Sequence, residues 1–367
     1  SAINYQKTNK GDGWLGLRFQ LDPSRASNDM VLHVRLLDND NRLQQQAIGI
    51  LGVNLLYACF RYASEPETLL RSLMDKLRDR VEIDMIRLEG PDFQHIDSRL
   101  VGLWSVKNGL SNIAIFGPDG RPLHAGEFLY KKSVLIARGS YRPPTLVQQD
   151  MIRCASAQFR EEHPLDAESV FFLTEITLDN LQAGGQLDEQ DFLDRAEILC
   201  ALGQTVIISN YAAHHELIAY LSDYRVTRIG IAIGVRKLRH IVLETYRDNP
   251  GNLLSSFGDI FLKNVRFYIH PALPLPGQTS ATEALMTAQN IEIPMDIHFL
   301  YDYLLENKNI VDIHAFNAQY LGIYHKEVLK MIQQQIPGWE SSVPPEVAEL
   351  IHRKALFNHP VSGQNAA

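Results

Sequence analysis

The sequence has little cysteine and no excess of positive charge. Its three cysteines, Cys59, Cys154 and Cys200, are widely spaced and form no Cys-x-x-Cys pair. We therefore expect buried thiols in a reducing cytoplasm, and neither disulfides nor a cysteine zinc site. The formal net charge of −8 argues against a nucleic-acid partner, because nucleic-acid-binding surfaces are basic. These features predict a cytoplasmic protein that does not bind nucleic acid.

Long hydrophobic runs and several common catalytic motifs are also missing. The longest apolar stretch, residues 47–60, is too short to span a bilayer, so we predict no membrane partner. The chain contains no P-loop, no Gly-x-Ser-x-Gly elbow and no His-Glu-x-x-His sequence. The adjacent residues His214 and His215 cannot present both rings to one metal from a single helical face. We predict no metal site, and the sequence identifies no cofactor.

What is present is an alternation of short strands and helices. Eight runs rich in apolar and β-branched residues are separated by stretches that mostly have helical patterns. The runs are 32–37, 83–88, 112–116, 134–137, 170–176, 205–209, 228–233 and 265–269. This alternation predicts an α/β fold with a mostly parallel sheet. Eight strands are the number that closes a (β/α)8 barrel (TIM barrel), and the alternative is an open doubly wound parallel sheet.

The composition changes on either side of this region. Residues 1–28 are rich in Gly, Asn, Asp and Ser, with one apolar run. They predict a linker with an edge strand, the remnant of a truncated N-terminal region. The proline-rich stretch 271–278 predicts the end of an α/β barrel-like domain that covers 29–275. Helical patterns beyond it predict a helical C-terminal appendage over 276–367, which is a candidate contact surface for a homo-oligomer.

Basic residues flank the fourth run. Lys132 precedes it, and Arg138 and Arg142 follow it. Guanidinium groups bind phosphate and carboxylate through forked hydrogen bonds, so we predict an anion site here. The alternative is a solvated basic loop, or ion pairs with acidic helices. Gly234 and Arg236 follow the seventh run and resemble the phosphate-binding turn that barrels place after late strands.

Carboxylates and a histidine stand near the ends of other runs. Arg87 and Glu89 either pair with neighbours or act on a substrate, because unpaired charges at a buried strand are costly. Glu175 lies among apolar residues and needs a partner or a raised pKa, and His270 has either an acid–base or a structural role. The catalytic candidates are Glu89, Glu175 and His270; the substrate-binding candidates are Arg87, Lys132, Arg138, Arg142, Asn210, Gly234 and Arg236.

Three segments carry a resemblance to a known family. They are residues 43–55 (LQQQAIGILGVNL), 82–93 (EIDMIRLEGPDF) and 199–211 (LCALGQTVIISNY). Together they resemble a poorly characterised bacterial family, with cyanobacterial members, often labelled nicotinate-nucleotide adenylyltransferase-like; some copies carry a TonB-dependent receptor label. The resemblance implies a nucleotide-like substrate and assigns no catalytic residues. The His-x-Gly-His motif of adenylyltransferases is absent.

These patterns lead to two hypotheses about function. The first is a cytoplasmic enzyme that acts on a small anionic, phosphorylated or nucleotide-like substrate, with the reaction class undetermined. The alternative is a non-catalytic binding or assembly module that uses the helical C-terminal region. An enzyme requires Glu89, Glu175 and Arg138 to converge on one open pocket, whereas a binding module predicts that these charges are paired and buried.

Overall fold

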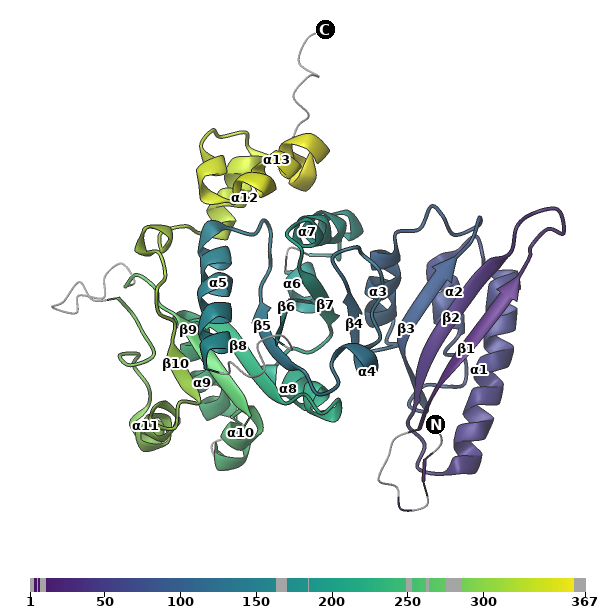
Figure 1. The fold of residues 1–367 in the computed structure, drawn as a ribbon, viewed down its shortest axis with the longest axis horizontal. Coiled ribbons are helices and arrows are strands. Elements are labelled where there is room, and N and C mark those ends of the chain that lie inside the picture. Colours follow the sequence, from purple (N-terminus) through teal and green to yellow (C-terminus); the bar gives the residue numbers. More distant parts are fainter. Residues whose placement is uncertain are drawn as a thin grey trace, which may run out of the picture. The chain divides into compact units, whose positions relative to one another are not determined.

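The computed structural model describes residues 3–4, 6, 11–162, 170–183, 185–248, 253–261, 264–274 and 285–359 (Figure 1). Each helix in these ranges is too short or too polar to cross a membrane. The chain forms two compact units. The first comprises Ser1–Phe128, Thr177–Glu189 and Thr205–Asn210, and the second comprises Leu129–Ile176, Gln190–Gln204 and Tyr211–Ala367. The predicted boundary at 275/276 lies outside the described residues, and the predicted domain limits stay predictions.

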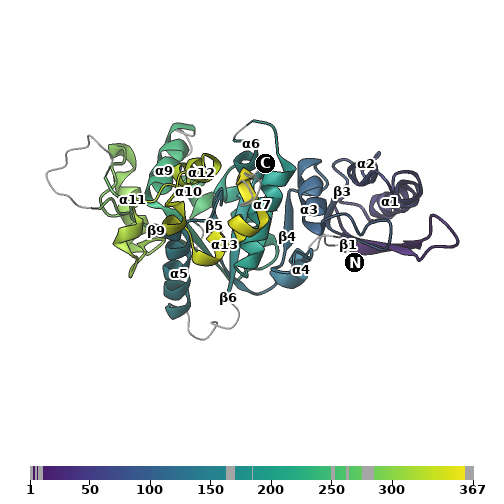
Figure 2. The same ribbon diagram turned by 90° about the horizontal axis from the view of Figure 1, so that it is seen from above.

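The first unit contains an antiparallel sheet with strand order β1-β2-β3. Its elements are β1 (Gly11–Phe19), β2 (Asn28–Leu36), α1 (Asn41–Arg61), α2 (Pro66–Ser72) and β3 (Val81–Glu89). Helices α1 and α2 cover one face of this sheet (Figure 2). Met30, Leu32 and Val34 alternate along β2 and are buried with Leu51 of α1 in one core. Since side chains alternate along a strand, His33 belongs to the opposite face.

The rest of the first unit is built around a short antiparallel strand pair, β4 with β7. Gly102 of α3 packs so closely on the β4 side chain of Ala114 that an added Cβ would lie 3.3 Å from it. The elements are α3 (Ser98–Lys107), β4 (Ile113–Phe116), α4 (Ala125–Phe128), α6 (Leu178–Gln182) and β7 (Thr205–Ser209).

A seven-stranded sheet has the order β10-β9-β8-β5-β6-β7-β4. In the second unit β5 pairs in parallel with β6 and β8, β8 with β9, and β9 with β10. Figure 2 shows α5 on one face of these strands and α9 on the other. The elements are β5 (Ser133–Arg138), α5 (Leu146–Glu161), β6 (Val170–Thr177), α7 (Glu189–Ala201), α8 (His214–Asp223), β8 (Arg228–Gly234), α9 (Val235–Asp248), α10 (Leu253–Ile260), β9 (Val265–His270) and β10 (Ile310–Asp312).

Helices dominate the described part of the C-terminal quarter, as its sequence pattern predicts. They are α11 (His298–Glu306), α12 (His325–Gln333) and α13 (Pro345–Lys354), with short 3-10 helices at Met295–Ile297, Ala318–Tyr320, Trp339–Ser342 and Leu356–Asn358. The strand β10 also belongs to this quarter and pairs with β9. A strand of three residues is too short to leave a periodic signal, and the sequence did not predict it.

All eight predicted strands are present, but they do not share one sheet. The mixed α/β fold with a mostly parallel sheet is confirmed, whereas a closed barrel is not shown. Two of the predicted strands, β2 and β3, form a separate antiparallel sheet with β1, in which β2 pairs with both β1 and β3. The burial patterns explain the difference: β2 alternates over most of its length, as one-sided antiparallel strands do, while β5 and β8 are buried at nearly every position.

Candidate functional site

Four of the predicted site residues lie at one edge of the parallel strands in the second unit. Arg138 ends β5, Glu175 lies near the end of β6, Gly234 ends β8 and His270 ends β9. Arg138 is in register with Glu175, and Gly234 with His270. Helix α9 starts immediately after Gly234, so its first backbone N–H groups also lie at this edge. Ligands of open α/β sheets bind at this carboxyl edge.

Arg138 and Glu175 form a forked ion pair. Arg138 Nε lies 2.8 Å from Glu175 Oε2 and Nη2 lies 2.9 Å from Oε1, while Nη1 donates to the carbonyl of Ala212 at 2.8 Å. The side chain of Glu175 is 0% exposed and that of Arg138 is 9% exposed. The guanidinium that we predicted to hold an anion is therefore engaged by a buried carboxylate.

Arg142 belongs to a second charged cluster. Its Nε lies 2.5 Å from Oδ1 of Asp191, and the other oxygen of this carboxylate accepts a hydrogen bond from Arg195. Arg195 is almost fully buried and also donates to the carbonyl of Ser140 at 3.0 Å. One carboxylate thus lies between two guanidinium groups, which leaves a net positive charge beside the strand edge. The half-buried Arg142 is the more accessible of the two.

His270 is held in one tautomer by a backbone carbonyl. Its Nδ1 lies 3.1 Å from the carbonyl oxygen of Pro271, which can only accept, so Nδ1 carries the hydrogen. Nε2 then carries the lone pair, and it lies 3.8 Å from Oδ2 of Asp150, too far for a hydrogen bond. Burial lowers the pKa of His270 even though Asp150 favours its charged form. The imidazole is therefore a neutral base near pH 7.

Asp150, at the start of α5, is kept ionised. Burial alone would raise the pKa of its carboxyl, but hydrogen bonds from Arg153 and from the backbone N–H of Asn317 outweigh burial and lower it. Arg153 Nη2 lies 2.7 Å from Oδ1, and the Asn317 nitrogen lies 2.7 Å from Oδ2. His270 therefore faces a negative charge, which would stabilise the imidazolium after proton uptake.

Three buried side-chain nitrogens at this edge make no hydrogen bond to any described residue. They are Arg236 Nε, His214 Nε2 and His270 Nε2. Arg236 is anchored by a 2.9 Å hydrogen bond from Nη2 to the carbonyl of Leu273. His214 is the first residue of α8, and burial, followed by the charges of Arg138 and Lys237, lowers its pKa well below the ordinary value.

The remaining predicted residues lie elsewhere. Lys132 precedes β5, and a strand rises roughly 3.3 Å per residue, so about 20 Å separates it from Arg138 at the other end. Arg87 and Glu89 belong to the first unit, are both exposed, and form a 3.4 Å ion pair with each other. Asn210 also belongs to the first unit, where its backbone nitrogen donates to the carbonyl of Asn112 at 2.9 Å. Glu89 and Glu175 therefore belong to different compact units, and Glu175 is buried in its pair with Arg138. The convergence of Glu89, Glu175 and Arg138 on one open pocket, which the enzyme hypothesis requires, is not shown, so an enzyme must rely on other residues.

Four residues of the candidate site were not predicted as site residues from the sequence. Asp150, Asp191 and Arg195 lie within helices, where charged residues usually mark a solvated face, so no local signal separates them from surface charges. His214 was considered only as a metal ligand. Its position at the start of a helix that follows a strand was the signal available.

The buried neutral His214 predicts a dependence of stability on pH. Its pKa is lower in the folded than in the unfolded chain, so the unfolded chain takes up a proton first as pH falls below about 6.5. The free energy of unfolding should therefore decrease with falling pH, by at most about 1.4 kcal/mol per pH unit for this residue. Urea unfolding of the parent and of His214→Gln between pH 7.5 and 5 measures this slope.

The control is His215→Gln, because His215 is the exposed neighbour of His214. The slope should become shallower in His214→Gln and stay parental in His215→Gln. Equal slopes in all three proteins would show that His214 takes up its proton equally in both states.

No family model matches this chain, and no curated protein matches it either. The functional conclusion is therefore drawn from the geometry of the site.

Proposed function

We propose that the carboxyl edge of β5, β8 and β9 binds a small anionic, phosphorylated or nucleotide-like molecule in the cytoplasm and acts on it as an enzyme. The observation that supports this most is the set of three buried nitrogens without a partner among the described residues, Arg236 Nε, His214 Nε2 and His270 Nε2. Buried polar atoms normally have hydrogen-bond partners, so these three nitrogens at a ligand-binding edge can form hydrogen bonds with a bound molecule.

The charges around these atoms favour an anion. Arg236 and Lys237 lie in the first turn of α9, whose N-terminal N–H groups attract negative charge. Arg142 and Arg195 share one carboxylate and leave a positive charge nearby. A phosphate is the anion that such helix N-termini and guanidinium groups bind most often. The proposal holds for a barrel and for an open sheet, because both place ligands at the carboxyl ends of strands.

His270 is the residue proposed to move a proton. Its Nε2 lone pair can take a proton from a substrate hydroxyl or a water molecule, and the Asp150 carboxylate at 3.8 Å would stabilise the imidazolium that results. Glu175 is fully engaged by Arg138 and is proposed to position Arg138 and the start of α8, since Arg138 donates to Ala212. The nucleotide-like character of the substrate rests on the family resemblance.

A thermal-shift screen with nicotinate mononucleotide, nucleotides, sugar phosphates and inorganic phosphate tests the proposal. A ligand at about a hundred times its Kd adds roughly 2.7 kcal/mol, which should raise the Tm by roughly 3–5 °C. The shift is expected in the parent and should disappear in Arg236→Ala, which removes the buried Nε. The control is Arg239→Ala on the same helix, because the side chain of Arg239 is 36% exposed and pairs with Glu292 at 3.7 Å.

A shift that survives in Arg236→Ala would place the anion elsewhere, and no shift with any ligand would contradict the proposal. In that case the second candidate function, assembly through the C-terminal helices, would gain support. Its observation is an apolar stripe around α11: Met295, Phe299 and Tyr303 recur every four residues and are 82%, 88% and 59% exposed. A homo-oligomer contact is the simplest way to cover such a stripe.

A further inference from the structure

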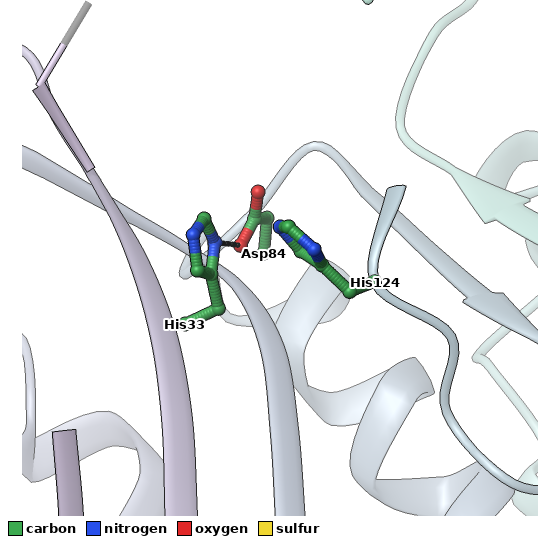
Figure 3. Close-up of side chains that lie close together, drawn as sticks. All are labelled: His33, Asp84 and His124. Carbon is green, nitrogen blue, oxygen red and sulfur yellow. Dashed lines mark hydrogen bonds and ion pairs between the residues drawn. The ribbon is translucent and has the colours of Figure 1, made fainter. Parts of the chain in front are cut away.

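A second cluster of titratable side chains lies in the first unit. His33 of β2, Asp84 of β3 and His124, which precedes α4, point toward one another in Figure 3. His33 and Asp84 are buried and His124 is half-buried. The cluster lies on the sheet face opposite the core under α1 and α2, and the function proposed above does not use it.

A β-bulge brings the first two side chains together. His33 pairs with Met85 and Val34 pairs with Ile83, so Asp84 is one extra residue on β3. The extra residue reverses the alternation of side chains, and Ile83 and Ile86 consequently both enter the core. Asp84 is thereby turned to the face of His33, where its Oδ1 lies 2.6 Å from His33 Nδ1.

His124 closes the cluster from a different segment. Its ring centroid lies 3.9 Å from that of His33, and Trp14 packs against both rings at 4.8 and 5.1 Å. His124 Nδ1 is buried and makes no hydrogen bond to any described residue. A Cβ on Gly126 would lie 2.8 Å from His124 Cε1, so the glycine leaves just enough room for the ring.

The three side chains each offer one ligand atom, and these atoms all lie within 4.8 Å of one another. Ligand atoms about 2.0–2.2 Å from a Zn²⁺ ion lie about 3.3 Å apart in a tetrahedral site, so small rotations of the side chains suffice. On the other side of the His33 ring, Asp12 Oδ2 lies 3.5 Å from Nε2 and can orient the imidazole from outside the ligand set.

We infer that His33, Asp84 and His124 bind one divalent transition-metal ion of the Zn²⁺ type. Two imidazoles and one carboxylate are the ligand set of such ions, and three protein ligands leave a fourth position for water or a substrate. Metal binding at His33 Nδ1 would replace the hydrogen between His33 and Asp84, and the neutral imidazole would then carry its hydrogen on Nε2, which faces Asp12 Oδ2 at 3.5 Å. Our sequence prediction of no metal considered the three cysteines and the adjacent histidines of one helix, whereas these ligands come from two strands and a loop.

The test is a calorimetric titration of Zn²⁺ into the full chain after treatment with EDTA. One equivalent should bind to the parent, and affinity should fall at least tenfold in His124→Ala, because loss of even an outer partner of a metal ligand costs about 10–100-fold. His298→Ala is the control, since His298 Nδ1 has a similar carboxylate contact, 2.9 Å from Asp302, at an exposed site. Affinity should be parental in the control.

Gly126→Ala tests whether weaker Zn²⁺ binding can occur without unfolding of the protein. It keeps every ligand but crowds the His124 ring, so we expect weaker Zn²⁺ binding with an unchanged far-UV circular dichroism spectrum. As a second readout, Co²⁺ should quench the fluorescence of Trp14, and this component of quenching should be absent in Trp14→Phe while Zn²⁺ still binds. No binding by the parent, or parental affinity in a folded His124→Ala, would overturn the inference.

Discussion

Glu175→Ala should lower the free energy of unfolding by about 3–5 kcal/mol, because it leaves the Arg138 guanidinium buried without its counter-charge. Two hydrogen bonds, of 2.8 and 2.9 Å, join the guanidinium of Arg138 to the two carboxylate oxygens of Glu175. Water has little access to either side chain. The carbonyl of Ala212 is the only other acceptor that the structure places on Arg138 among the described residues. One neutral acceptor cannot replace a carboxylate. Urea unfolding followed by circular dichroism measures the loss.

The matched control is an exposed pair with the same forked geometry. Arg18 Nε and Nη2 lie 2.7 and 2.8 Å from the two oxygens of Asp29, but the Arg18 side chain is 73% exposed. Asp29→Ala should lower the free energy of unfolding far less than Glu175→Ala does, because solvent screens an exposed pair. The double variant Arg138→Met/Glu175→Leu should recover most of the stability lost in Glu175→Ala. An equal loss in Glu175→Ala and Asp29→Ala would show that burial of the pair is unimportant.

The Arg138–Glu175 ion pair decides between the two roles that the sequence predicts for Arg138. The sequence leaves open whether the basic segment binds an anion or forms ion pairs. In the structure Arg138 forms an ion pair with Glu175. Arg236 keeps a buried nitrogen without a partner among the described residues, so it replaces Arg138 as the proposed anion ligand. Arg138 would then position the site without contacting the anion, because its hydrogen bond to the carbonyl of Ala212 holds the segment that leads into α8 and His214.

The positions of the strands could be predicted from sequence because their cause is local. Runs of β-branched residues such as 205–209 have few other stable conformations between helices. Which strands pair is decided by contacts far apart in the sequence, and therefore β2 and β3 were assigned to the same sheet as β5. The polar residues that alternate with the apolar ones along β2, Asp29, His33 and Arg35, were the one local sign of a sheet with one covered face.

The candidate sites divide in the same way. Residues at strand ends, such as His270 and Gly234, could be placed at the carboxyl edge from the sequence, because strand direction follows from the βα alternation. The partner of His270 could not be predicted from the sequence, because Asp150 lies on a helix and 120 residues earlier in the chain. The cluster of His33 and Asp84 depends on a bulge, and a bulge of one residue changes no periodicity strongly enough to be recognised beforehand.

Trp339→Ala is the second change for which we expect a loss of about 3–5 kcal/mol. Trp339 is 2% exposed and lies in a core formed by Val328 and Ile332 of α12, the segment from 343 to 357, and Ile198 of α7. Removal of the indole leaves a cavity between elements that are more than 120 residues apart in the chain. Unfolding should remain a loss of the whole second unit, because α7 belongs to the same core. Denaturant unfolding and near-UV circular dichroism measure both effects.

Phe299→Ala is the control, because it also removes an aromatic ring from the C-terminal quarter, but from a side chain that is 88% exposed. Its free energy of unfolding should change by less than about 0.5 kcal/mol. If Trp339→Ala were equally mild, the packing of the helices after β10 on α7 would contribute little to the stability of the second unit. A large loss confined to Trp339→Ala would mean that these helices complete the core of the second unit. Within this quarter, the exposed stripe around Phe299 would then be the surface left for a partner.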